Sequence, residues 1–176
     1  MDKTSIPPLS ASEESAWRAL TYVANHLVKV LGEDLATDAP VTLSEYVVLV
    51  HLSEAEERRL RIGDLASISA LSPSRMSRLV DDMAAKGHLT KSRRADDGRC
   101  TWATLTPLGL STLQATYPTQ LRNVRRRVFD PLTSDDVQAL DTALWKIRIA
   151  LDPVTPAPLP GRGPRPSPTA AAPSSI

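Results

Sequence analysis

The chain has 176 residues, of which 41% are hydrophobic and 23% charged, the length and composition of one globular domain rather than two. Its net charge of +1 does not exclude a polyanionic partner, because basic residues are concentrated between Ser72 and Arg99 and again between Arg122 and Arg127. The longest apolar run, Tyr46–Val50, is far too short to span a bilayer, and one cysteine cannot form an internal disulfide, so we expect a cytoplasmic protein with no membrane partner.

The first predicted element is a helix over residues 12–31. Ser10 and Glu13 have the spacing of a capping box, and apolar residues recur at helical intervals as far as Leu31. Gly32 lies where a C-terminal cap belongs, so we expect the helix to end there.

A second helix is predicted from Thr42 or Ser44 to about Leu52. Its central pair, Val47-Val48, fits a helix or a strand equally well, so the pattern alone leaves this choice open. A short helix is predicted next, with one apolar side made of Ile62, Leu65, Ala66 and Ile68.

The segment after this short helix carries the clearest signal. Ser72 is a good N-cap, and Pro73 suits the first helical position, where its missing N–H is not needed. The helix that they open ends at Lys86-Gly87, a basic last turn followed by a glycine cap. Its apolar residues share one face: Met76, Leu79, Val80 and Met83. Two short helices joined by a tight turn, the second with Ser and Arg on its exposed N-terminal half, are typical of a helix-turn-helix.

Two strand-like runs follow, His88–Ser92 and Cys100–Leu105. The Asp97-Gly98 pair between them favours a hairpin, and the tip of this hairpin is basic. A helix-turn-helix followed directly by such a hairpin is a winged helix, here at about residues 42–106. We therefore expect a mainly α protein with a small β-hairpin wing.

The C-terminal half predicts two more helices. Thr106-Pro107 opens a long one, in which Pro118 should produce a kink or a break. A final helix begins near Thr133 and reaches Leu151. One small winged-helix unit cannot bury both this helix and the first one, whereas a two-fold dimer can.

The predicted organisation has three parts. Residues 1–9 are expected to be a flexible N-terminus, and residues 10–151 a domain with dimerisation helices at about 12–31 and 107–151. Residues 152–176 are rich in proline and almost free of large apolar side chains. Such a segment cannot bury enough surface to offset its ordering entropy, so we expect a disordered tail.

The chain from about Leu20 to Leu151 resembles the MarR (multiple antibiotic resistance regulator) family of bacterial transcription factors. The stretches that carry the resemblance, in this order, are Leu65-Ala66, Ser72–Asp81, Gly87–Leu89, Asp97–Arg99, Leu105–Gly109, Val124–Arg126 and Asp130–Leu132. The resemblance implies a winged helix-turn-helix homodimer with interleaved terminal helices, a recognition helix in each major groove and a wing in each flanking minor groove. It also implies a repressor that binds an inverted-repeat operator in double-stranded DNA and is released by a small, frequently phenolic or anionic, effector.

The resemblance also assigns roles to single residues. The expected DNA-binding residues are Ser72, Ser74, Arg75, Ser77 and Arg78 of the recognition helix and Arg93, Arg94 and Arg99 of the wing. Asp97 is expected to orient Arg99 rather than to touch DNA. Gly98 stands where many relatives have an arginine, so the wing contact rests on Arg99 with help from the other two wing arginines. Trp17 and Tyr46 are candidates for effector binding, although each fits a place in the core or an interface better.

The sequence contains no motif for catalysis. It lacks a Gly-rich phosphate loop and a nucleophile elbow, and its three histidines are not spaced as metal ligands. We therefore expect no catalytic residue, no metal, no cofactor and no enzyme activity. Cys100 is interpreted as an inert strand residue, with a redox-sensing disulfide between chains as the alternative. The competing hypothesis for function is a winged-helix module that docks an acidic protein, but hydroxyls at a helix N-terminus suit phosphate better.

Overall fold

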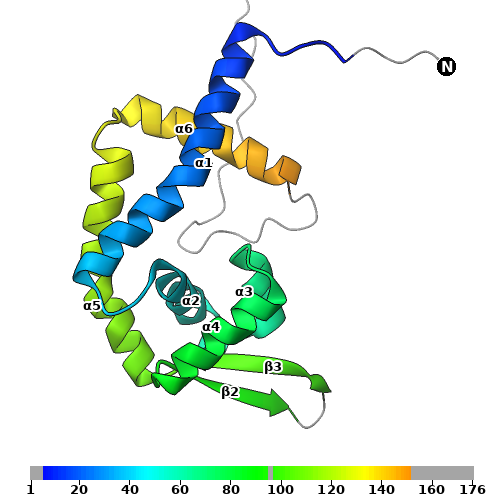
Figure 1. The fold of residues 1–176 in the computed structure, drawn as a ribbon, viewed down its shortest axis with the longest axis vertical. Helices are drawn as coiled ribbons and strands as arrows, with labels where there is room; N and C mark the ends of the chain where they lie inside the picture. Colours follow the sequence, from blue (N-terminus) through cyan, green and yellow to red (C-terminus); the bar gives the residue numbers. More distant parts are fainter. Residues whose placement is uncertain (1–5, 95–96, 152–176) are drawn as a thin grey trace, which may run out of the picture. The chain divides into compact units, whose positions relative to one another are not determined.

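The computed structural model describes residues 6–94 and 97–151, and the predicted tail lies outside these residues. The helices are α1 (Ala11–Asp38), α2 (Leu43–Glu54), α3 (Ile62–Ile68), α4 (Pro73–Ala85), α5 (Pro107–Val124) and α6 (Ser134–Leu151), and the strands are β1 (Arg59–Arg61), β2 (Leu89–Arg94) and β3 (Asp97–Leu105) (Figure 1). Within the described residues no helix is long and apolar enough to cross a membrane. The chain divides into two compact units, and the boundary along the sequence falls between Pro131 and Leu132.

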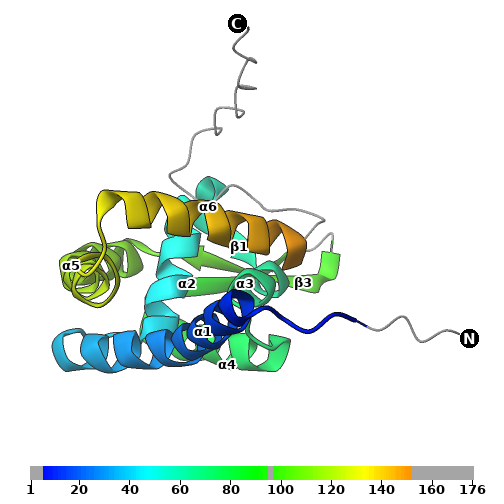
Figure 2. The same ribbon diagram turned by 90° about the horizontal axis from the view of Figure 1, so that it is seen from above.

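The core of the first unit lies between α2, α3, α4 and the sheet. Its fully buried side chains include Leu49, Leu65, Met76, Val80 and Met83. The apolar face that the sequence predicts for α4 is therefore the face that packs. In this core α2 contacts both β3 and α5 (Figure 1 and Figure 2).

The ambiguous valine pair lies in a helix because α2 has a capping box at its start. The Thr42 N–H donates to Glu45 Oε2 at 2.7 Å, and the Glu45 N–H donates to Thr42 Oγ1 at 3.3 Å. These two bonds give partners to two backbone N–H groups at the helix start that have no partner within the helix itself. They therefore favour a helix over a strand at this place. Val48 is completely buried, so the pair is held in the core as helix.

The sheet has three antiparallel strands in the order β1-β3-β2. Both predicted strands are present, and each extends farther toward the hairpin tip than the sequence pattern indicates. The strand β1 was not predicted. It pairs with β3 in the register Leu60↔Ala103 and so closes the free edge of the hairpin. The expected fold, mainly helical with a small β wing, is confirmed.

The predicted end of the first helix at Gly32 is wrong. The helix continues to Asp38, and the N–H of Ala39 closes it by donating to the carbonyl of Leu35 at 3.0 Å. Leu31 and Leu35 are both buried, so the apolar face continues past the glycine. Packing of this face outweighs the modest cost of about 1 kcal/mol for glycine inside a helix.

Pro118 does not break α5, which runs through it to Val124. The proline lies on the exposed side of the helix, where water can satisfy the carbonyl that loses its donor. On the opposite side Leu113, Thr116 and Gln120 are buried and hold the helix in place. The regular α geometry changes only afterwards, in a π-helical turn over Arg125–Phe129.

An ion pair joins the C-terminal part of α1 to this π-helical turn. Arg127 donates from Nε to Asp34 Oδ2 at 2.7 Å and from Nη2 to Oδ1 at 2.8 Å, and Arg126 lies 3.0 Å from the same carboxylate. The hydrogen bond from Arg127 is the main reason that the pKa of Asp34 falls from its ordinary value of 3.8 to about 2.

This ion pair predicts a pH-dependent difference between the wild type and Asp34→Asn. Because the folded-state pKa is lowered, the carboxylate stabilises the fold fully above its ordinary pKa of about 4, and this stabilisation is lost as the pH falls toward 2. The two proteins should therefore differ in free energy of unfolding at pH 6 and converge between pH 4 and pH 2. Urea unfolding at a series of pH values measures this, and a difference independent of pH would contradict it.

Ala70, in the turn between α3 and α4, has a left-handed backbone with φ of +51°. An L-residue adopts this conformation at a cost of about 1–2 kcal/mol, which glycine avoids while losing some additional chain entropy. Ala70→Gly should therefore raise the free energy of unfolding by about 0.5–1 kcal/mol in urea titration. The matched control is Ala115→Gly, at an exposed position inside α5, which should lower it by about 1 kcal/mol. Equal destabilisation by both substitutions would refute this account of the turn.

The second unit is described over α6. The Thr133 N–H donates to Asp136 Oδ2 at 2.9 Å and the Asp136 N–H to Thr133 Oγ1 at 3.2 Å, which confirms the predicted start of this helix. Five of its large apolar side chains are exposed, namely Leu140, Leu144, Ile147, Ile149 and Leu151.

Candidate nucleic-acid interface

The helix α4 is held firmly in the winged-helix core. At its start the Arg75 N–H donates to Ser72 Oγ at 3.3 Å, and Pro73 occupies the first turn, as the sequence predicts. Its buried face contacts α3 and β2. This anchoring determines which side chains of α4 point away from the protein.

The exposed face of α4 presents hydroxyl and guanidinium groups. Ser72, Ser74, Arg75 and Arg78 are exposed, and Ser77 is half-buried. Neither Arg75 nor Arg78 forms an ion pair with a residue in the described part of the chain, so their donors are available to a ligand. Arginine can pair in bidentate fashion with guanine or phosphate, and serine hydroxyls donate to phosphate oxygens. The structure thus brings all five predicted recognition-helix residues to one helix end.

The hairpin brings the predicted wing residues to its tip. Arg93 is paired with Thr101 and Arg94 with Asp97, and the register shifts between the two arginines. Arg99 follows Asp97 on β3 at the same end of the hairpin. The side chains of residues 93–100 lie outside the described part, so the predicted orienting role of Asp97 and the roles of Arg99 and Cys100 stay predictions.

Two ion pairs that the sequence did not reveal fix the recognition helix. Lys91 on β2 pairs with Asp81 on α4. Lys86, at the end of α4, donates from Nζ to Glu45 Oε1 on α2 at 2.6 Å. Burial raises the pKa of Glu45, but the hydrogen bonds from Lys86 and Thr42 together lower it by more. The resulting pKa lies below the ordinary value for glutamate. The carboxylate therefore stays ionised at neutral pH and holds the C-terminal end of α4 on α2.

A second basic feature lies on the outer face of the sheet. The guanidinium groups of Arg59 and Arg61 lie over the Trp102 ring, 5.2 and 5.3 Å from its centroid. Sequence reasoning missed both arginines because β1 is only three residues long. The alternation Arg59-Leu60-Arg61, with an inward leucine between outward arginines, is the signal that could have predicted this strand.

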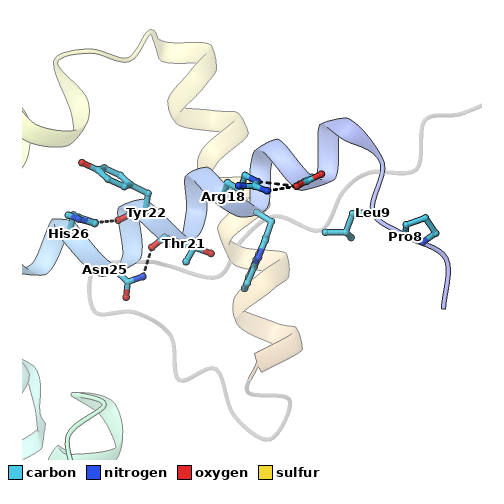
Figure 3. Close-up of a pocket in the computed structure, with 9 residues that line it drawn as sticks. Pro8, Leu9, Arg18, Thr21, Tyr22, Asn25 and His26 are labelled. Carbon is cyan, nitrogen blue, oxygen red and sulfur yellow. Dashed lines mark hydrogen bonds and ion pairs between the residues drawn. The ribbon is translucent and has the colours of Figure 1, made fainter.

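The two effector candidates do not lie in one pocket. Trp17 is 59% exposed on α1 and lines a pocket of about 790 Å³. Tyr22 and His26 line the same pocket (Figure 3). Their rings are stacked, with centroids 4.0 Å apart. Tyr46 is buried in the core of the winged helix, and its burial raises the pKa of its hydroxyl. Tyr46 therefore has the core position that the sequence already favoured for it.

Among the described residues no three His, Cys, Asp or Glu side chains lie close enough together to hold a metal ion.

Comparisons with known proteins place this geometry in a family. The model of the MarR family matches residues 39–99, which include the recognition helix and most of the wing. AbsC, a MarR family transcriptional regulator from Streptomyces coelicolor, is 34% identical with a TM-score of 0.73, and the match covers 83% of this chain and 98% of AbsC. Sco3205, from the same organism and solved in complex with DNA, is 31% identical with a TM-score of 0.77, over 90% of this chain and 98% of its own.

A more distant structure, BpsR from Bordetella bronchiseptica, is 20% identical with a TM-score of 0.66 and shows the shared fold, over 81% of this chain and 98% of its own. No curated protein matches significantly. The two Streptomyces structures match nearly their whole length, at an identity high enough to assign the family. The chain belongs to the MarR family of transcriptional regulators.

Proposed function

We propose that the protein is a repressor that binds a palindromic operator as a homodimer and is released by a small effector. The observation that carries the proposal is the pair of arginines on α4, Arg75 and Arg78, exposed and without a described ionic partner on a helix whose other face is locked in the core. The DNA complex of Sco3205, at 31% identity, supports DNA as the ligand of this face.

In this proposal α4 enters the major groove. Arg75 and Arg78 pair with guanine edges, and the serines of the first turns donate to phosphates. The residues assigned to phosphate or base contact are Ser72, Ser74, Arg75, Ser77 and Arg78. The wing arginines Arg93, Arg94 and Arg99 contact the flanking minor groove, with Asp97 orienting Arg99.

The proposal of a homodimer is supported by apolar surface in both units. On α1 the side chains of Trp17, Tyr22, Val23 and Val28 are at least half exposed, and all large apolar side chains of α6 are exposed to some degree. Apolar surface of this extent on long helices marks an interaction site. A two-fold partner covers such surfaces on both chains at once and presents two recognition helices to DNA.

The last part of the proposal is release by a small effector. The DNA binding of BpsR is regulated by 6-hydroxynicotinic acid, but BpsR shares only the fold with this chain. The open pocket beside Trp17 is large enough for a molecule of that kind. As a DNA-binding regulator, the protein would act in the cytoplasm.

The test is a fluorescence-anisotropy titration of the full chain on a duplex from its own upstream region and on a scrambled duplex of equal length. We expect the upstream duplex to bind at least a thousandfold more tightly at physiological salt. Equal affinity for both duplexes would contradict sequence-specific regulation. Absence of binding to either would favour the winged-helix module that docks an acidic protein.

A further inference from the structure

The side of the small sheet opposite the buried Leu89 and Ala103 carries a basic patch that the proposed contacts of α4 and the wing do not use. Arg61 lies opposite Trp102 in the pairing register, and Trp102 lies opposite Ser92. Directly paired residues of antiparallel strands point to the same face of a sheet. We call this side the outer sheet face, and the register assigns to it Arg59, Arg61, Thr90, Ser92, Trp102 and Thr104.

Arg61 offers guanidinium donors that are held in place but not neutralised. It is exposed, and its guanidinium lies 5.3 Å from the centroid of the Trp102 ring. It forms no ion pair with any described residue, including Asp64 in the first turn of α3. A guanidinium stacked on an aromatic ring keeps its in-plane N–H donors free for an anion. The ring therefore positions Arg61 without satisfying its charge.

Arg59 has a different role, because a strained turn supplies it with a carboxylate. Glu57 and Arg58, in the turn before β1, both have left-handed backbones, with φ of +50° and +53°. Each costs about 1–2 kcal/mol for an L-residue. The turn brings Glu57 Oε2 within 2.7 Å of Arg59 Nη2. Strain of this kind is typical of functional segments, and here it fixes the arginine that shares the ring with Arg61.

The chemistry of the outer sheet face matches the phosphate backbone of a duplex. Thr90 and Ser92 are exposed beside the two arginines, and hydroxyl and guanidinium groups are the usual donors to phosphate oxygens. Single-stranded nucleic acids need bare aromatic rings on which bases stack. The Trp102 ring already carries guanidinium groups, so the face presents charged donors instead of a stacking platform.

The outer sheet face is continuous with the wing, which favours DNA over a separate acidic protein. β1 runs antiparallel to β3 and so points toward the hairpin tip, with Arg61 as its last residue. Trp102 is three positions from Arg99 along β3, a distance of about 10 Å. This length corresponds to about three base pairs of duplex. An arginine here reaches phosphates beside the minor groove that the wing is proposed to enter.

From these observations we propose that Arg61 binds the phosphate backbone of the DNA just outside the groove entered by the wing, with Trp102 and Arg59 holding it in position. The contact is independent of base sequence, so it lengthens the binding site without changing the bases that are read. The inference rests on the proposed function, because it takes the wing to lie on DNA.

The test compares two operator duplexes in anisotropy titrations with the full chain. The core duplex ends at the wing's minor groove, and the extended duplex carries about six more base pairs of unrelated sequence at each end, enough for the predicted reach. The wild type should bind the extended duplex about tenfold more tightly at physiological salt, and Arg61→Gln should lose most of this gain. On the extended duplex alone, its log–log salt dependence should become shallower by up to about two for a dimer.

Further variants separate this contact from a general effect of charge. Arg61→Lys should keep most of the salt dependence, because the charge remains. Trp102→Leu keeps both arginines but removes the ring, and should reduce the gain severalfold. Arg18→Gln removes an exposed arginine from α1 and should keep the whole gain. Methylphosphonates in place of the flanking phosphates should abolish the gain of the wild type and leave Arg61→Gln unaffected.

The outcomes distinguish this inference from the proposed function. Preference of the wild type for operator over scrambled duplex, combined with a full gain in Arg61→Gln, would overturn the inference alone. Equal binding of operator and scrambled duplexes, with a gain that still depends on Arg61, would contradict the proposed function and leave the phosphate contact standing. Absence of binding to any duplex would refute both and assign the outer sheet face to an acidic protein.

Discussion

Replacing Arg78 by alanine is expected to weaken binding to the operator by about 1–3 kcal/mol per half-site. The side chain lies on the exposed face of α4, two positions from the fully buried Met76, and has no described ionic partner that would hold it away from a base. If it pairs with guanine, the variant should also lose discrimination at one symmetric position of the operator. Anisotropy titrations on a set of duplexes, each substituted at one position, measure both effects.

Two variants separate base reading from general charge. Arg99→Ala on the wing should weaken binding more evenly across sequences and reduce the slope of log affinity against log salt by up to about two for a dimer. Arg18→Ala removes an exposed arginine from α1, where it pairs with Glu14 at 2.6 Å, and should leave operator discrimination unchanged. Loss of discrimination in Arg18→Ala, or wild-type binding by both Arg78→Ala and Arg99→Ala, would show that α4 and the wing do not form the interface.

Gly109→Ala is expected to destabilise the fold by about 3 kcal/mol or more, the upper end for overpacking. A Cβ at this position would lie 2.0 Å from the carbonyl oxygen of His88 and 2.8 Å from Leu105 Cδ1. The His88 oxygen cannot move away easily, because it accepts hydrogen bonds from the Thr106 N–H at 3.1 Å and from Thr106 Oγ1 at 3.0 Å. These contacts join the end of α4 to the start of α5, so the strain would loosen the recognition helix as well.

Thermal unfolding followed by circular dichroism measures this effect, with a fall in Tm of roughly 10 °C expected. Gly63→Ala is the matched control, because nothing lies within 4 Å of the added Cβ and the position is helical. It should leave Tm unchanged or raise it by a few degrees. A Tm for Gly109→Ala equal to that of the wild type would contradict the close approach.

Local chemistry explains why the recognition helix could be predicted from the sequence. Ser72 and Pro73 determine its start through contacts within four residues, and the spacing of Met76, Val80 and Met83 defines its buried face. The same holds for α6, whose capping residues Thr133 and Asp136 are three positions apart.

Features that depend on distant contacts could not be predicted. The first helix continues beyond Gly32 because Leu35 packs into a core whose other side chains come from later segments of the chain. The strand β1 is too short for a periodic signal and exists through its pairing with β3. Asp34 and Arg127 are separated by 93 positions, and nothing local to either residue indicates that they meet.

The central claim is that the chain reads DNA as a two-fold dimer through α4 and the wing, and the most direct measurement is hydroxyl-radical footprinting on its own upstream region. The account predicts two equivalent protected half-sites related by inverted symmetry, with centres about 10 bp apart or a multiple of this. Protection should disappear with the Arg75→Ala, Arg78→Ala double variant at a concentration where wild type saturates the site. Protection of a single asymmetric half-site, or a footprint that the double variant reproduces, would contradict the account.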